Sequence, residues 1–346
     1  MEKIEIQNLL EAYYAMGTLK FVECRNHRVQ ARRFESVAEH VYTAQQWAWL
    51  LWSESLGAAI SIFRVVAMLS LSELYNTKKS TVILFGNWQK QSLILSLISE
   101  FDENKTADAK FAHVCKAFAD GEEHIRDWNI GVDISWDAYE KIMGVYNILD
   151  TLKPKIRQGV INWNITDVRR ESIAEHVYST QQLAWLMWLE TNEEIDILKV
   201  VSTLSIHEVE ETIIGDITPY SGITPEQKRE MGIKAVRKVL GILKQYEFMH
   251  SLINEFDDEE TPNAFFAHLC DKLDCDLTIK YYSDGGYCSI ENATDSMKNN
   301  HKIQKLILDG AETVADVFIM ADEHMYAGTI FEEVVNFVKT CNVTTI

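Results

Sequence analysis

One segment of this chain occurs twice, and that repeat constrains the fold more than any other feature. Residues 35–52 read ESVAEHVYTAQQWAWLLW and residues 171–188 read ESIAEHVYSTQQLAWLMW, so thirteen of eighteen positions are identical. Further matches follow in the same order: FRVVAMLSLSELYNT (63–77) with LKVVSTLSIHEVEET (198–212), and LISEFDENKTADAKFAHVCKAF (97–118) with LINEFDDEETPNAFFAHLCDKL (252–273). Because the period is too long and the copies too few for a solenoid, we infer an internal duplication with a boundary near 130–140.

Both copies are predicted to be all-α. The whole chain has four prolines, which leaves room for long helices. Helix starts are indicated by three capping-box patterns, Ser36–Glu39, Ser172–Glu175 and Thr224–Gln227, the last with Pro225 at the first helical position. Residues 215–224, rich in Gly, Pro, Ser and Thr, are predicted to form a loop of the kind that borders sites. We predict two tandem helical domains, residues 1–138 and 139–346.

Charge and composition exclude several classes of protein. A chain of 346 residues can bury two cores, and its formal net charge of −19 argues against a nucleic-acid polymer as partner. A small anionic substrate remains compatible with a local basic pocket. The amino terminus lacks the pattern of a signal peptide, and no segment offers about 18 uninterrupted apolar residues to span a membrane. Six cysteines without CxxC spacing fit reduced thiols, so we predict a cytoplasmic protein.

The second copy contains a set of residues suited to metal chemistry. The candidate ligands of one divalent ion are His176, near the start of a helix, the adjacent His207 and Glu208 on another helix, and Asp271 on a later helix. Two imidazoles with two carboxylates suit Mn, Co, Fe, Ni or Zn. Glu211 follows His207 by four residues, one helical turn, and could handle protons beside the ion. Asp216 follows in the predicted loop.

Each of these residues also has a simpler explanation as a helix cap, a core residue or part of a solvated helix face. Comparison of the two copies favours the metal-site explanation over these simpler ones. At the positions of His207, Glu211, Asp216 and Asp271, the first copy has Ser72, Asn76, Thr81 and Lys116; of this set it keeps His40 and Glu73. Capping and core residues stay the same while the chemical groups change together, which favours the loss of one metal site. His268 is matched by His113, so a structural role is favoured there.

These motifs together resemble those of the HD-domain metal-dependent phosphohydrolases, and more narrowly the 5′-deoxynucleotidase branch. The resemblance covers about residues 150–280 and rests on an ordered series: Leu152-Lys153 with Arg157 and Gly159, Glu171 to His176, His207-Glu208 with Glu211, Gly215-Asp216, and Asp271 with Leu273. It implies a helical fold around one divalent ion and removal of the 5′-phosphate from a nucleotide. It also implies catalytic roles for Glu211 and Asp216 and phosphate binding by Arg157 and Lys153.

The chain departs from the family pattern in three places. Glu208 stands where the family has aspartate, Val160 stands where it has tryptophan, with Trp163 nearby, and residues 283–346 have no evident counterpart. Domains of this branch are often homodimers, so the resemblance implies that the two copies pack as an intramolecular pseudo-dimer, with further self-association left open.

Two other classes of function remain open from the sequence. Other HD chemistry, such as a nucleoside triphosphohydrolase, a phosphodiesterase or a di-iron oxygenase, would be indicated by two metal ions per chain. A non-catalytic nucleotide sensor or scaffold would be indicated by activity that survives loss of Glu211.

Overall fold

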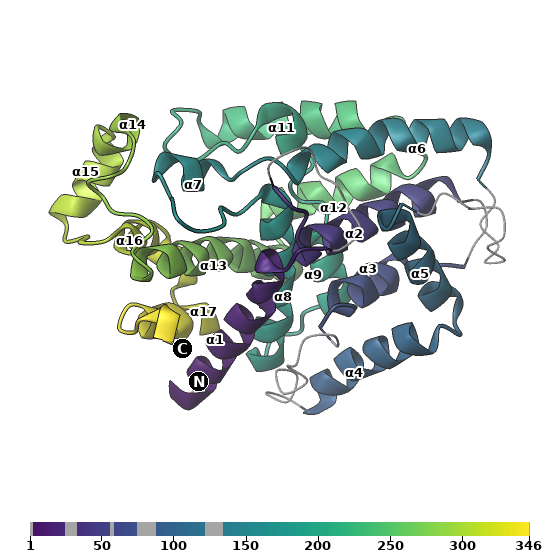
Figure 1. The fold of residues 1–346 in the computed structure, drawn as a ribbon, viewed down its shortest axis with the longest axis horizontal. Helices are drawn as coiled ribbons and strands as arrows, with labels where there is room; N and C mark the ends of the chain where they lie inside the picture. Colours follow the sequence, from purple (N-terminus) through teal and green to yellow (C-terminus); the bar gives the residue numbers. More distant parts are fainter. Residues whose placement is uncertain (1–2, 25–32, 56–58, 75–87, 122–133, 346) are drawn as a thin grey trace.

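The computed structural model describes residues 3–24, 33–55, 59–74, 88–121 and 134–345, and the described chain is all-α, as predicted (Figure 1). The first half contains α1 (Lys3–Gly17), η1 (Thr18–Phe21), α2 (Val37–Glu54), α3 (Ile62–Leu71), α4 (Trp88–Glu103) and α5 (Ala107–Ala119). The second half contains α6 (Trp136–Leu149), η4 (Asp150–Leu152), α7 (Gln158–Asn162), α8 (Ile173–Glu190), α9 (Ile197–Leu204), α10 (Glu211–Ile214), α11 (Pro225–Leu240), α12 (Tyr246–Asp258) and α13 (Pro262–Asp284). The remaining elements are α14 (Asp295–Lys298), α15 (His301–Leu308), α16 (Val314–Tyr326), α17 (Ile330–Val338) and η5 (Val343–Thr345).

The repeated segments carry the same order of elements. A helix and a short 3₁₀ turn (α1–η1 or α6–η4) lead to an isolated bridge, Glu23 to Ser36 or Ile156 to Ser172. A helix with a capping box then follows, α2 or α8, and the predicted box before α11 is also present. The counterparts Asn76 and Thr81 lie outside the described residues.

The first helix of each half packs against the other half. Helix α1 packs on α8, whereas α6 packs on α2 (Figure 1). Helix α2 also packs on α8, and α3 packs on α9, so residues of both halves share one hydrophobic core. The predicted division between residues 138 and 139 falls inside α6. Two separate globular bodies are therefore excluded, because each half completes the core of the other.

Polar contacts between the halves are reciprocal. Matching residues make matching hydrogen bonds: Ser36 Oγ to Glu175 Oε1 (2.8 Å) and Ser172 Oγ to Glu39 Oε1 (2.7 Å), Trp49 Nε1 to Ser205 Oγ (2.7 Å) and Trp185 Nε1 to Ser70 Oγ (3.0 Å). Arg33 and Arg169 each form ion pairs with both Glu39 and Glu175. When a residue of one unit contacts a second position of the other unit, and the reverse contact also occurs, the pair of contacts is called reciprocal. Reciprocal contacts are typical of an isologous twofold interface.

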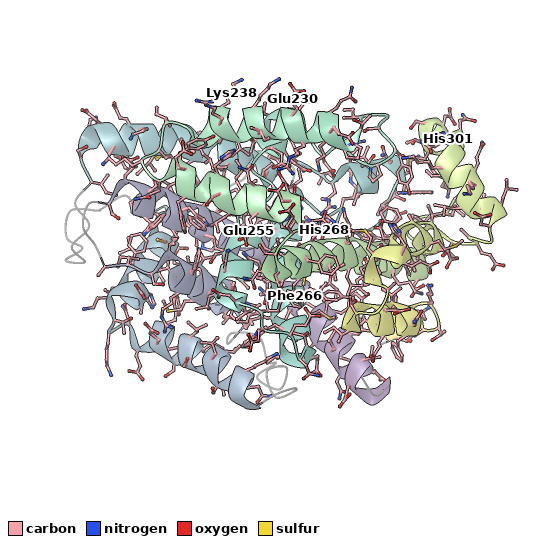
Figure 2. All side chains as sticks on the ribbon, turned by 180° about the vertical axis from the view of Figure 1, so that it is seen from behind. Glu230, Lys238, Glu255, Phe266, His268 and His301 are labelled. Carbon is pink, nitrogen blue, oxygen red and sulfur yellow. The ribbon has the colours of Figure 1, made fainter. Side chains whose placement is uncertain are left out.

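The segment after residue 283 is helical, as its sequence pattern predicts, and packs on the second half. Helices α16 and α17 pack on α13, and α17 also packs on α8 and α1. Val160 and Trp163 are buried in a second apolar cluster with Val314 and Val317 of α16, so they serve packing of this segment. Along the upper edge of the molecule as drawn in Figure 2, Glu230 and Lys238 of α11 point outward. No described helix is both long and apolar enough to cross a bilayer.

Candidate metal centre

The four predicted ligands come from three segments of the second half. His176 lies in the first turns of α8, directly after the capping box of Ser172, and Asp271 lies in α13. His207 and Glu208 were expected on a helix, but the structure places them in the turns between α9 and α10. Backbone hydrogen bonds there span three residues, as from Val209 N to Ile206 O (3.2 Å), which gives a tighter turn than an α-helix.

The structure brings these four side chains together. One potential ligand atom of each lies within 4.8 Å of the others. His176 Nε2 is 2.8 Å from Asp271 Oδ1 and 3.4 Å from Glu208 Oε1, and His207 Nε2 is 3.6 Å from both of those oxygens. Ligand bonds of about 2.0–2.2 Å place neighbouring ligand atoms about 3 Å apart, so one ion of this class fits the set.

His207 provides the most direct test of that fit. Its Nδ1 is 2.7 Å from the carbonyl oxygen of Leu204, so Nδ1–H donates and Nε2 carries the lone pair. That Nε2 is buried and has no hydrogen-bond partner among the described residues. A buried acceptor that faces two carboxylates without a donor is the arrangement a cation requires.

Electrostatics at the cluster also favour a cation. Burial raises the pKa of Asp271 and Glu208, but the neighbouring imidazoles outweigh it and hold both pKa values below the ordinary range. Burial and Arg157 lower the pKa of His176, yet hydrogen bonds to Asp271, Asp274 and Glu208 raise it well above 6.5. The carboxylates therefore stay charged and attract positive charge into the cluster. A divalent ion can supply that charge in place of the proton on an imidazole.

A residue that sequence reasoning missed, Asp274, holds the second nitrogen of His176. Its Oδ2 lies 2.7 Å from His176 Nδ1, and its Oδ1 accepts a 2.6 Å hydrogen bond from Tyr13 OH. Carboxylates that bind the outer nitrogen of a ligating histidine fix its orientation and its tautomer. The spacing of three residues from Asp271 on one helix was the signal in the sequence, because such residues share a face.

Glu211, Asp216 and Arg157 lie together beside the cluster. Glu211 is 3% exposed and its Oε2 has no partner among the described residues; burial, with the charges of Glu208 and Asp216, raises its pKa well above the ordinary range. Arg157 Nε is 3.6 Å from Asp216 Oδ2, which also accepts from the backbone N–H of Gln158 (2.6 Å). This group combines a buried carboxyl with a fixed guanidinium.

Lys153, predicted to bind substrate phosphate, makes different contacts. Its Nζ is 2.6 Å from Asp150 Oδ1 and 3.2 Å from Glu35 Oε1, across the interface between the halves. The matching Lys20 pairs with Glu171 in the same way. A contact that occurs in both halves serves the shared fold, so the ammonium of Lys153 is engaged away from the metal ligands.

Two other lysines lie closer to the cluster, and the sequence did not single them out. Lys272 Nζ is 3.7 Å from Asp271 Oδ2. Burial lowers the pKa of Lys228 on α11, but the charges of Glu208, Glu211 and Glu210 raise it overall. Lysines on helix surfaces are common, so neither had a distinguishing signal in the sequence.

His268 lies outside the ligand set. It is near the start of α13, beside α12 (Figure 2), where its Nε2 is 3.3 Å from Glu259 Oε1 and its ring contacts Phe256 at 5.8 Å between centroids. In the first half, His113 stacks on the matching Phe101 at 4.2 Å. Each histidine therefore packs against the matching phenylalanine, which agrees with the structural role favoured by the sequence comparison.

The matching positions of the first half carry an internal ion pair instead. Lys116 Nζ binds the carboxylate of Glu73, and Ser72 Oγ donates to the carbonyl of Leu69 (2.9 Å). His40 Nε2 lies 3.3 Å from Asp120 Oδ1. Among the described residues, both groups of side chains that could hold an ion include His176.

Comparison with known proteins relates this part of the chain to a family. Residues 149–310 match the family model of the HD domain, so this part of the chain is similar to HD domains. The match extends past residue 280, where the sequence resemblance was expected to end, and includes α14 and α15.

Several similar proteins are named 5′-deoxynucleotidases. The 5′-deoxynucleotidase hdd1 of Schizosaccharomyces pombe is 28% identical over 139 residues, which cover 38% of this chain and 68% of that protein. The 5′-deoxynucleotidase HDDC2 of Dictyostelium discoideum is 24% identical over 166 residues, covering 46% of this chain and 82% of that protein. The solved PH0347 protein of Pyrococcus horikoshii OT3 is 22% identical with a TM-score of 0.41, over 58% of this chain and 97% of that one, a likeness too low to support an argument.

Proposed function

We propose that this protein is a metal-dependent phosphohydrolase that removes the 5′-phosphate of deoxynucleoside monophosphates. The observation that carries the proposal is the buried, unpartnered Nε2 of His207 beside the carboxylates of Glu208 and Asp271. The HD-domain match and the names of the relatives support the class of reaction.

We assign the ion to His176, His207, Glu208 and Asp271. When bound, a divalent ion supplies Lewis acidity toward a phosphate oxygen. Glutamate at position 208 reaches the cluster from the tight turn after α9, where Oε1 lies 3.4 Å from His176 Nε2. Glutamate therefore reaches the cluster at the position where the family pattern has aspartate.

We assign proton transfer to Glu211 and phosphate binding to Arg157. The Oε2 atom of Glu211 is buried without a partner, so it can exchange a proton with the leaving 5′-oxygen. Arg157 Nη1 is likewise buried without a partner among the described residues, and a planar guanidinium suits a phosphate group. Asp216 holds Arg157 and the start of α7 in place. We assign the role of additional phosphate-binding cation to Lys272 and Lys228 and no longer to Lys153.

We further propose that the two halves are copies of one domain packed as a pseudo-dimer, and that the first copy has lost its metal site. The reciprocal contacts of Ser36 with Glu175 and of Ser172 with Glu39 support this arrangement. The cytoplasmic location stays a prediction from the sequence.

The proposal is tested with purified full-length protein loaded with Mn²⁺ or Co²⁺. A panel of ribo- and deoxynucleoside monophosphates, triphosphates and cyclic nucleotides is assayed for released phosphate. We expect release from 5′-deoxynucleoside monophosphates, and none from the Asp271→Ala variant prepared in parallel. A metal-loaded protein that hydrolyses no monophosphate would overturn the assignment, and hydrolysis of triphosphates or cyclic nucleotides alone would replace it with another HD chemistry.

A further inference from the structure

A chain of three hydrogen-bonded side chains runs from the first half of the protein into the metal cluster of the second. Tyr13 OH on α1 donates to Asp274 Oδ1 at 2.6 Å. Asp274 Oδ2 lies 2.7 Å from His176 Nδ1, and His176 Nε2 faces Asp271 at 2.8 Å. Tyr13 is 3% exposed, and Asp274 and His176 are fully buried. Both oxygens of Asp274 are therefore engaged, one by each half of the chain.

The packing of α1 explains how a residue of the first half reaches this position. Helix α1 lies against α8, which carries His176, and not only against elements of its own half (Figure 1). Tyr14, the next residue, donates to the carbonyl oxygen of Leu277 on α13 (3.0 Å). Helix α1 thus contacts both helices that carry the other two members of the hydrogen-bonded chain, α13 with Asp274 and α8 with His176.

The two halves provide an internal control for what this chain of contacts does. Aligning Thr18-Leu19-Lys20 with Thr151-Leu152-Lys153 places Tyr146 opposite Tyr13, and the helix repeat places Ala119 opposite Asp274. Tyr146 OH donates to Asp150 Oδ1 (3.1 Å), and its ring stacks on Trp47 at 4.4 Å. The tyrosine is present in both halves, but the buried acid occurs only where the metal ligands occur.

The bond from Tyr13 to Asp274 has no counterpart at the matching tyrosine. Tyr146 donates to Asp150 of its own half, whereas the acceptor of Tyr13 is itself bonded to the candidate ligand His176. This direct connection to a candidate ligand links the bond to the metal cluster.

The physical role of Tyr13 follows from the burial of Asp274. A buried carboxylate is costly unless its oxygens are hydrogen-bonded. Without the phenol, Oδ1 would be left buried without that donor, the charged carboxylate would be less stable, and Oδ2 would hold His176 Nδ1–H less firmly. His176 would then present Nε2 to the ion with less fixed orientation.

We infer that Tyr13 is a positioning residue of the metal centre, acting through Asp274 on His176, so that the first half completes the site of the second. The inference rests on the proposed metal site and assigns a task to a half that has lost its own ligands. It also explains why α1 is packed on the opposite half.

The test measures Co²⁺ affinity of the full-length apoprotein by visible absorption in competition with a chelator, without substrate. We expect Asp274→Asn to weaken binding by about 10- to 100-fold and Tyr13→Phe by about 3- to 10-fold, since outer contacts of a ligand tune affinity on this scale. Tyr146→Phe, which removes the matching hydroxyl, should leave the affinity unchanged. Thermal unfolding in EDTA verifies that each variant is folded.

A double-mutant cycle decides whether Tyr13 acts through Asp274. In the Asp274→Asn background, Tyr13→Phe should have no further effect on Co²⁺ affinity. Unchanged affinity of Tyr13→Phe, or an equal loss in both backgrounds, would overturn the inference. Should Tyr13→Phe fail to fold, an Asp274→Asn protein that binds Co²⁺ as tightly as the unmodified chain would overturn it instead. A protein that shows the expected Co²⁺ affinities but cleaves no nucleotide would refute the proposed function and leave this inference standing.

Discussion

The two halves of the molecule have similar local structure but differently charged side chains at the positions that match the candidate metal ligands. In the second half, His176, His207, Glu208 and Asp271 converge on a space suited to a cation. At the matching positions the first half has His40, Ser72, Glu73 and Lys116, and the ammonium of Lys116 is bound to Glu73. The ammonium group of Lys116 thus neutralises the carboxylate of Glu73. An ion pair of this kind indicates how a domain can lack the metal ion and keep its fold.

The local backbone contacts underline this comparison. Ser72 Oγ binds the carbonyl of Leu69, just as His207 Nδ1 binds the carbonyl of Leu204. This contact at the start of the turn is therefore the same on both sides, and the side chain decides whether a free imidazole nitrogen faces the cluster. At this position the backbone contact is shared by both halves, and the imidazole occurs only in the second half.

The largest difference between the halves should appear when one ligand position is altered on each side. Asp271→Ala removes a ligand and should weaken Mn²⁺ or Co²⁺ binding by more than about 100-fold, beyond the effect of outer contacts. Lys116→Ala, at the matching position, should leave metal affinity unchanged. Calorimetric titration with the metal alone measures both. Comparable losses in the two variants would refute the assignment of one functional and one degenerate site.

Glu211→Gln should separate metal binding from catalysis. Loss of the acid–base group is expected to lower the rate of phosphate release by about 10²- to 10⁴-fold. Metal affinity should stay unchanged, because Glu211 is outside the ligand set. A rate equal to that of the unmodified protein would favour a non-catalytic role for this chain or a contaminating phosphatase.

The pH dependence of stability should identify His40 as a structural cation. Burial lowers its pKa, but contacts with Cys24 and Glu35 outweigh this and raise it to about 9. Since the folded pKa exceeds the unfolded value, the stabilisation is complete below about pH 6.5 and is lost as the pH rises through 9, by on the order of 2 kcal/mol.

Urea unfolding of the apoprotein between pH 6 and 10 measures this loss. The His40→Gln variant serves as the control and should show a smaller decrease over the same range. If the unfolding free energies of the two proteins changed equally with pH, His40 would not be protonated in the folded state. The first half would then have no internal cation at His40 in addition to Lys116.

The smallest effects should be equal on the two sides. Ser36→Ala and Ser172→Ala each remove an N-cap and one hydrogen bond to a glutamate of the other half. Each should cost about 1 kcal/mol of unfolding free energy. Denaturant unfolding should give the same loss within about 0.5 kcal/mol, and a loss at one serine alone would contradict the reciprocal interface.

The sequence predicted the features that depend on local pattern and on repetition. The capping boxes at Ser36 and Ser172 predicted two helix starts, and the mismatch of Asp271 with Lys116 predicted which half carries a cluster that could hold an ion. Features set by tertiary packing were not predictable. Nothing local shows that α1 packs on α8, so the bond from Tyr13 to Asp274 could not be foreseen.

Two local details also escaped prediction for physical reasons. The segment containing His207 and Glu208 has helical sequence character, yet its backbone forms tighter three-residue turns that depend on the surrounding core. Lys153 lies within a family-like motif, but its ammonium is drawn to Glu35 and Asp150 at the interface. In both cases long-range contacts decide the outcome.

Metal stoichiometry tests the central claim most directly. The full-length protein, saturated with Mn²⁺ or Co²⁺ and freed of excess ions, is analysed by elemental mass spectrometry together with its Asp271→Ala and Lys116→Ala variants. We expect one ion per chain in the unmodified protein and in Lys116→Ala, and none in Asp271→Ala. Two ions per chain, or an ion retained by Asp271→Ala, would contradict a single metal centre in the second half.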